Sequence, residues 1–207
     1  MTDPVFRDLE LTPADEPMLA ALRARHGEPQ RRYHDWSHVT ALARAFADHR
    51  ALFADGRAVA LAILYHDAIY DPASATNEAD SADLLVHERT GQEPAETLVL
   101  AEAMIRATAG HAVPDGLGPR ATRDCAAFLD LDLSILAAPP EAYDAYVSGV
   151  RTEYAHVPDA AWRAGRTMVL SGFAERDRLF LTDALHEAWD GRARKNIARE
   201  LDALGAA

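Results

Sequence analysis

The segment GRAVALAILYHDAIY, residues 56–70, is apolar on most sides when it is read as a helix. A helix that is apolar all round is expected at the centre of a domain, covered by its neighbours. The segment also carries His66 and Asp67 near its C-terminal end. A charged carboxylate in a core is costly unless it is paired or bound to a cation. The segment therefore predicts a central helix with a functional site near its end.

Helical periodicity extends on both sides of this segment. The apolar positions are Val39, Leu42, Ala43, Phe46 and Leu52 in 39–53, and Leu98, Leu100, Ala101, Met104 and Ile105 in 96–108. A proline with an acidic residue in the first turn marks helix starts near Pro13, Pro94, Pro140 and Pro158. Alanine is abundant and β-branched residues are sparse. We expect an all-α chain of about eight helices with little or no sheet.

Length and charge narrow the classes of function. The 207 residues suit a single domain over 1–207, and 49% of them are hydrophobic, which is enough to fill a core. The formal net charge is −12, from 33 acidic and 21 basic residues. Such a surface repels phosphate backbones and anionic lipid, so we expect neither general nucleic-acid binding nor membrane binding. A small phosphorylated substrate is compatible, because a metal reverses the local field.

The single cysteine, Cys125, excludes an intrachain disulfide and favours a reduced, cytoplasmic protein. Its apolar setting, CAAFLDLDL, predicts a buried and inert thiol rather than a nucleophile. The N-terminal MTDPVFRDLELTP has an early acid and no long apolar run, so we expect no signal peptide. No stretch of about 18 apolar residues predicts a membrane span.

The first potential ligands are in YHDWSH, residues 33–38. His34 and His38 are four residues apart, so they share a face if both lie on one helix. The zinc pattern HExxH fails, because position 35 is Asp. Asp35 or Ser37 could instead cap a helix here, which would place His34 at or before its start. In that case His34 is a structural or a substrate-side residue.

His66 and Asp67 offer mixed nitrogen and oxygen ligation. Together with a further His and Asp, this donor set suits Mn²⁺, Fe²⁺, Co²⁺, Ni²⁺ or Zn²⁺ better than Ca²⁺. The alternative for the dipeptide alone is an ordinary helix C-terminus followed by a turn. Asp130 and Asp132 lie among leucines, and two such acids on a helix face different sides. One of them can therefore be a ligand while the other pairs elsewhere.

The order His38, His66-Asp67, Asp132 resembles the HD superfamily of metal-dependent phosphohydrolases. The chain is similar in particular to a bacterial branch of predicted metal-dependent phosphohydrolases of that superfamily. The stretches that carry this resemblance are YHDWSH (33–38), LYHDAIYDP (64–72), NEADSA (77–82), TAGH (108–111), FLDLDLSILA (128–137), YDAYVSGVRTEY (143–154) and ARKNIARELDAL (193–204).

The resemblance implies a single helical bundle of the HD-domain type and a divalent metal held by His38, His66, Asp67 and Asp132. The metal is expected to be Mn, Fe, Co, Ni or Zn, with Mg also allowed. Some members hold two metals through extra histidines, and His111 stands in such a position. The other histidine of that interval, His87, is expected on the surface. A mononuclear site is therefore favoured, with His111 near substrate phosphate or as an additional ligand.

The expected reaction is hydrolysis of a phosphoester by metal-bound hydroxide, on a nucleotide or another small phosphorylated metabolite. Asp67, Asp71 and His111 are the expected catalytic residues. Asp71, like Glu78, could orient or deprotonate the water, although each also fits an acid in a turn or at a helix start.

His34 and Arg151 are the expected substrate-binding residues, and Arg166 and Lys195 are further cations. A buried pair of Arg151 with Glu153 is the structural alternative for Arg151. Tyr33 and Trp36 could stack on a base, but core packing is the favoured interpretation for both.

Two other classes of function stay open. One is a non-catalytic nucleotide-binding helical protein, against which the intact ligand set weighs. The other is a di-iron HD-type oxygenase, against which the lack of a second clear histidine weighs. A homodimer is one assembly that all of these interpretations allow.

Overall fold

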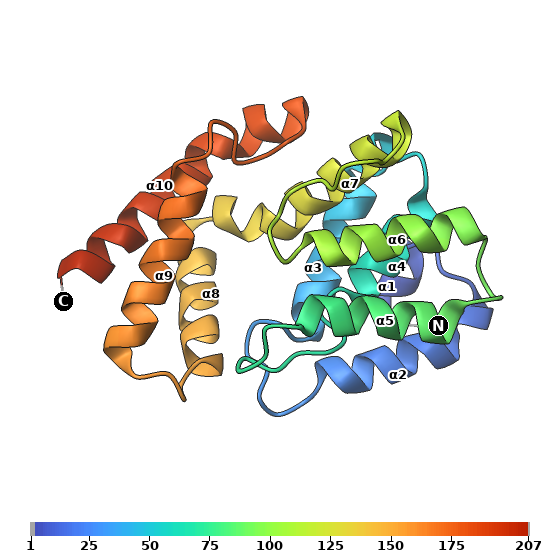
Figure 1. Ribbon diagram of the computed structural model, residues 1–207, viewed down its shortest axis with the longest axis horizontal. Helices are drawn as coiled ribbons and strands as arrows, with labels where there is room; N and C mark the ends of the chain where they lie inside the picture. Colours follow the sequence, from blue (N-terminus) through green and yellow to red (C-terminus); the bar gives the residue numbers. More distant parts are fainter. Residues whose placement is uncertain (1–2, 207) are drawn as a thin grey trace. The chain divides into compact units, whose positions relative to one another are not determined.

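The computed structural model describes residues 3–206, and in that range the chain forms helices and no strand (Figure 1). The all-α class is therefore confirmed. The chain divides into two compact units, the first ending at Leu131 and the second beginning at Asp132. Each unit is described by itself, and the single domain over 1–207 stays a prediction.

The first unit contains nine helical elements within its described part. They are α1 (Pro4–Asp8), the 3₁₀ helix η1 (Pro13–Asp15), α2 (Glu16–His26), α3 (Trp36–Asp48), the 3₁₀ helix η2 (Arg50–Leu52), α4 (Gly56–Tyr65), α5 (Asn77–Arg89), α6 (Ala95–Ala107) and α7 (Pro119–Asp132), whose last residue opens the second unit. The second unit continues with η3 (Leu133–Ala137), α8 (Pro140–Glu153), α9 (Asp159–Ala174) and α10 (Asp183–Ala206).

The predicted helix starts agree with the observed ones. Pro13 begins η1, and Pro140 is the first residue of α8. Pro94 and Pro158 are the cap residues before α6 and α9. The fixed φ of proline and its missing N–H suit these positions, where the backbone amides have no partner inside the helix.

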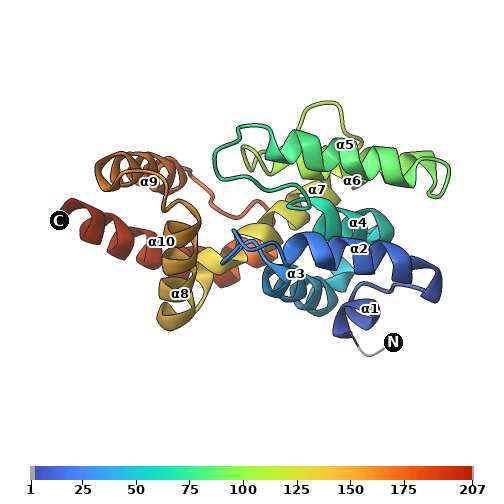
Figure 2. The same ribbon diagram turned by 90° about the horizontal axis from the view of Figure 1, so that it is seen from below.

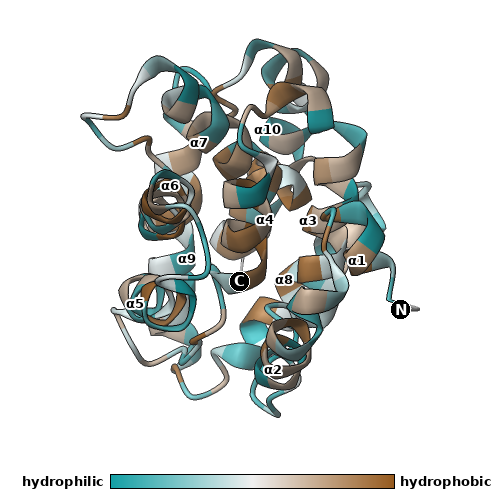
Figure 3. Cartoon of the chain, turned by 90° about the vertical axis from the view of Figure 1, so that its right-hand side faces the viewer, coloured by the Kyte–Doolittle hydropathy of each residue, from teal (hydrophilic) through white to brown (hydrophobic). Residues whose placement is uncertain are grey.

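The central helix of the first unit is α4. All of its residues except Arg57 are buried. It contacts α3, α5 and α6, and α5 and α6 run side by side in two views (Figures 1 and 2). Figure 3 shows hydrophobic residues along α4 and α6. The expectation of a central helix apolar on most sides is confirmed.

This helix ends at Tyr65 and does not continue to residue 70 as the apolar pattern suggests. His66 is the C-cap residue, and the amide of Ala68 donates to the carbonyl of Tyr65 in a turn. The amide of Ile69 donates to the hydroxyl of Ser81 on α5 instead of to its own helix. A partner from another element therefore competes with the helical hydrogen bond, and His66 and Asp67 lie at a helix end.

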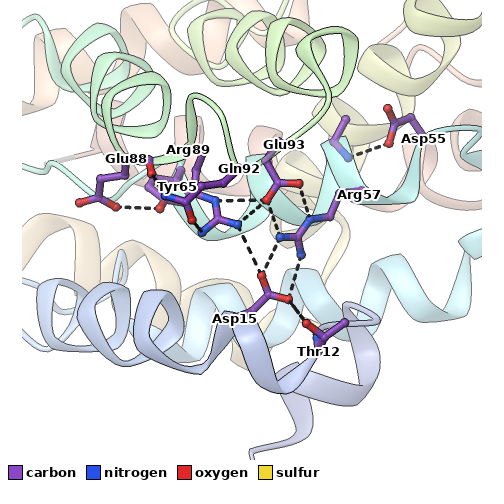
Figure 4. Close-up of polar contacts among 10 residues, drawn as sticks. Thr12, Asp15, Asp55, Arg57, Tyr65, Glu88, Arg89, Gln92 and Glu93 are labelled. Atoms are coloured by element: carbon purple, nitrogen blue, oxygen red, sulfur yellow. Dashed lines mark hydrogen bonds and ion pairs between the residues drawn. The ribbon is translucent and has the colours of Figure 1, made fainter.

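A network of ion pairs fastens the start of α4 (Figure 4). Arg57 Nη2 lies 2.6 Å from Asp15 Oδ1 and 2.6 Å from Glu93 Oε1, and Arg89 also binds Glu93. Burial alone would raise the pKa of Asp15 and of Glu93, but hydrogen bonds from Arg57 outweigh it and lower both values. Both carboxylates are therefore ionised, and they join η1, α4 and the segment before α6.

In the second unit, α10 packs against η3 and α9. The core includes Leu170, Phe180 and Ile197. A buried ion pair joins α9 to α10, with Arg166 Nε 2.7 Å from Glu200 Oε1. The hydroxyl of Tyr143 on α8 donates to the other oxygen of the same carboxylate. One carboxylate thus links three helices of this unit.

Cys125 is fully buried in α7, as its apolar setting predicts. Burial, with the charge of Asp124, raises the pKa of its thiol to about 11, so the side chain is protonated at neutral pH and is a poor nucleophile. Among the described residues, no helix has the length and apolar character needed to cross a membrane.

Candidate metal centre

His38 is positioned by the start of α3. Asp35 is the N-cap residue, and its carboxylate accepts a hydrogen bond of 2.8 Å from the amide of Ser37. This cap begins the helix at Trp36, so the buried His38 lies in the first turn. His34 lies before the helix, in agreement with the capping alternative. The four-residue spacing of the two histidines is therefore not a shared helical face.

His66 and Asp67 are positioned by the end of α4. The Nδ1–H of the buried His66 ring donates to the carbonyl of Ile63 at 3.0 Å. This hydrogen bond places the proton on Nδ1 and leaves the Nε2 lone pair for another partner. The side chain of Asp67 is 16% exposed, so the site opens to solvent on its side.

Three donor atoms from these residues converge. Those of His38, His66 and Asp67 lie within 4.8 Å of one another. The two histidine Nε2 atoms are 3.1 Å apart, and Asp67 Oδ2 is 3.0 Å from His66 Nε2 and 3.8 Å from His38 Nε2. Two donors that each lie about 2.0–2.2 Å from one metal are about 3.0–3.5 Å apart. Two of the three distances lie in this range and the third, 3.8 Å, exceeds it, so the triad is a candidate site for one transition metal ion.

The charges favour a cation as well. Burial alone would raise the pKa of Asp67, but the charge and hydrogen bond of His66 and the nearby His34 and His38 lower it well below its usual range. The carboxylate is therefore ionised. With the His66 proton on Nδ1, the short Nε2–Nε2 contact needs a proton or a cation between the two nitrogens. When a metal takes the place of that proton, the two imidazoles are neutral, and with one carboxylate they form a donor set for divalent transition metals.

His34 lies beside this triad. Its ring centroid is 6.1 Å from that of His38, and it stacks on Tyr70 at 4.4 Å. Tyr33 contacts both histidine rings, at 4.9 Å each. The expected substrate-side residue is thus next to the candidate ligands, on a platform of aromatic rings. Tyr33 belongs to the same platform.

The other residues considered for catalysis lie in a loop, in the first turn of a helix and after a helix end. Asp71 is exposed, and its carboxylate accepts a hydrogen bond from the amide of Ala73. Glu78 is in the first turn of α5, where it complements the helix dipole. His111 follows α6 with a positive φ of 46°. Among the described residues, the convergent donor group does not include these three side chains.

Asp132 and Arg151 belong to the second unit. Asp132 ends α7 and is the first residue of that unit, so the triad of the first unit is described without it. Its role as a fourth ligand stays a prediction. Arg151 forms its ion pair with Asp159, donates to the carbonyls of Tyr154 and Val157, and lies over the Trp162 ring.

Sequence reasoning missed two buried residues near the site. Arg31, in the loop before α3, donates to the carbonyl of Asp67. His26 ends α2, contacts the Trp36 ring edge to face, and is close enough to His66 and Asp67 for charge interactions. Neither residue has a sequence signal, because RHGEPQRRY contains several similar cations.

His26 gives a pH-dependent prediction. Its Nδ1–H donates to the carbonyl of Leu22, and its Nε2 has no hydrogen-bond partner among residues 3–206. Burial lowers its pKa from 6.5 to about 4. Between pH 6.5 and pH 4 the histidine of the unfolded chain binds a proton that the folded chain does not bind. The free energy of unfolding therefore falls as the pH falls through this range, and this group accounts for about 3 kcal/mol of the loss.

Urea unfolding of His26→Leu from pH 7 to pH 4 measures this contribution. The variant should lose stability on acidification less steeply than the wild-type protein. His87→Leu, which removes an exposed histidine of α5, is the control and should keep the wild-type slope. If the stability of His26→Leu and of the wild-type protein fell equally steeply with pH, the pH dependence would not come from His26.

Comparison with models of protein families, with curated proteins and with solved structures gives no match. The fold and the site therefore define the class by themselves. That class is an all-helical protein with a candidate metal centre of two histidines and one aspartate.

Proposed function

We propose that this protein is a metal-dependent phosphohydrolase of the HD-domain type. The single observation that carries the proposal is the convergence of His38, His66 and Asp67 within 4.8 Å at the buried end of α4. The order of these residues in the chain, followed by Asp132, supports the same assignment through its resemblance to the HD superfamily. The proposed substrate is a nucleotide or another small phosphorylated metabolite.

Each residue of the site has its own proposed role. His38, His66 and Asp67 would hold the metal, with Asp132 as the proposed fourth ligand. The hydrogen bond from His66 Nδ1 to Ile63 holds a proton on Nδ1 and fixes the ring orientation, so Nε2 is the nitrogen that would bind the metal. A bound divalent ion lowers the pKa of a coordinated water and polarises a phosphoryl oxygen. The metal is proposed to be Mn, Fe, Co, Ni or Zn, with Mg also allowed.

Substrate would approach from the exposed side of Asp67 and meet His34, which is close enough to Asp67 for a charge interaction. The His34 ring is half-buried on Tyr70, so its orientation is set before substrate binds. We propose that this ring contacts the phosphate. Asp71 and His111 are retained as proposed catalytic residues, and Arg151 as a proposed phosphate contact.

A panel of phosphatase and phosphodiesterase substrates tests this function. Nucleoside monophosphates, cyclic nucleotides and simple phosphoesters are offered with Mn²⁺, Co²⁺, Ni²⁺ or Mg²⁺. We expect hydrolysis of at least one class, loss of that activity after chelation and dialysis, and recovery when the metal is returned. Nucleotide binding without turnover under every metal would instead support the non-catalytic alternative. An iron spectrum with substrate oxidation would support the oxygenase alternative.

A further inference from the structure

Arg31 is an arginine whose side chain is 0% exposed. It lies in the loop between α2 and α3, next to the exposed Arg32. A guanidinium group removed from water is costly unless its charge and its N–H groups are satisfied. Because this guanidinium is buried beside the candidate metal ligands, its contacts must compensate the cost of removing it from water.

All the donors of Arg31 are occupied. Its Nη1 donates to the carbonyls of His34 at 2.9 Å and Asp67 at 2.7 Å, and its Nη2 donates to the carbonyl of Ala68 at 3.2 Å. Its Nε and Nη2 also donate to Glu28 Oε2, at 3.3 and 3.2 Å. A guanidinium has five N–H donors, and each has an acceptor here. No donor is left for a substrate phosphate.

The accepted carbonyls belong to both ligand-bearing segments. Asp67 and Ala68 follow the end of α4, where the last carbonyls of a helix lack intrahelical partners. The carbonyl of His34 belongs to the segment that leads into α3 and His38. One planar group therefore ties the turn that carries His66 and Asp67 to the chain that presents His38.

The charge of Arg31 is compensated where it lies. The carboxylate of Glu28 forms an ion pair with it, and the C-terminal end of α4 adds partial negative charge. The guanidinium carbon also lies 5.3 Å from the centroid of the Tyr70 ring, on which His34 stacks. The same residue thus supports the aromatic platform of the site.

We infer that Arg31 is the positioning residue of the metal centre. It sets the distance between the His38 and the His66–Asp67 ligands by holding both backbones. This inference rests on the proposed metal site. Lysine at this position would keep the charge, but it has three N–H donors instead of five and lacks the planar fork. It therefore cannot satisfy the carbonyls of His34, Asp67 and Ala68 and the Glu28 carboxylate together.

Metal affinity tests the inference without any substrate. Co²⁺ is titrated into metal-free wild-type protein and Arg31→Lys, and the dissociation constant and the visible Co²⁺ spectrum are recorded. We expect Arg31→Lys to bind Co²⁺ about 10–100-fold more weakly, with an altered spectrum, as is usual when a residue that orients ligands is lost. In Arg31→Ala, added guanidinium at millimolar concentration should restore part of the affinity.

Two control variants separate positioning from folding. Arg57→Lys weakens another buried arginine network, at the opposite end of α4, and should lower stability without changing the Co²⁺ affinity of the folded protein. Arg32→Lys changes the neighbouring arginine, whose side chain is exposed. It should keep wild-type affinity.

The outcomes distinguish the two proposals. Wild-type Co²⁺ affinity and spectrum in folded Arg31→Lys would overturn the role of Arg31 and leave the metal site standing. Absence of Co²⁺ binding by the wild-type protein would overturn the metal site itself. Wild-type binding without hydrolysis of any substrate would overturn the phosphohydrolase and leave the role of Arg31 to be judged on affinity alone.

Discussion

Replacing Asp67 with alanine is expected to abolish metal-dependent hydrolysis, lowering kcat/KM by about 10³-fold or more, because it removes a ligand and the charge that attracts the cation. The Oδ2 atom of Asp67 is the only carboxylate oxygen in the convergent donor group of the described residues. Asp67→Asn keeps the shape of the side chain, and its loss of activity would show that the negative charge is required.

Kinetics and metal titration on the same samples measure this effect. Circular dichroism establishes that each variant is folded before its activity is compared. Asp83→Ala is the matched control, because Asp83 is an exposed carboxylate on α5 that pairs with Arg106. It should keep wild-type activity. Activity that survives in folded Asp67→Ala would rule out the proposed centre.

Arg57→Leu is expected to have the largest effect on stability, at about 3–5 kcal/mol, because it leaves two buried carboxylates without their shared partner. The side chains of Asp15 and Glu93 are only 6% and 5% exposed. Arg89 Nη2 still lies 2.5 Å from Glu93 Oε1 but 3.7 Å from Asp15 Oδ1, so the loss falls mainly on Asp15.

Urea unfolding at pH 7 measures the difference. Arg106→Leu is the control, because its ion pairs with Asp83 and Glu102 lie at the surface and contribute about 0–1 kcal/mol. Equal losses of unfolding free energy in Arg57→Leu and Arg106→Leu would contradict the prediction that the buried ion pairs contribute more than the exposed ones.

The same network predicts how the free energy of unfolding changes with pH. The pKa values of Asp15 and Glu93 are lowered in the folded chain, so their contribution is present above the usual carboxyl range near 4 and is lost as pH falls through the folded values. Arg57→Leu removes most of that contribution. The gap in stability between the variant and the wild-type protein should therefore narrow on acidification.

Local rules predict much of the fold correctly. The periodic spacing in 39–53 covers α3, which ends at Asp48, and the separate η2, and the spacing in 96–108 corresponds to α6. The proline positions mark the helix starts. These rules depend only on residues that are close together in the sequence. The end of α4 is different, because Ser81 on another helix captures the amide of Ile69.

The sequence by itself determined that this chain is helical and that its most apolar segment leads into a His-Asp pair, and it offered a helix cap at Asp35 or Ser37 before His38. These properties follow from composition, spacing and capping. Only the tertiary structure decided that three donor atoms converge, and that Arg31 is buried while Arg32 is exposed. Adjacent identical residues differ in this way because burial depends on which carbonyls of a distant helix end lie within reach.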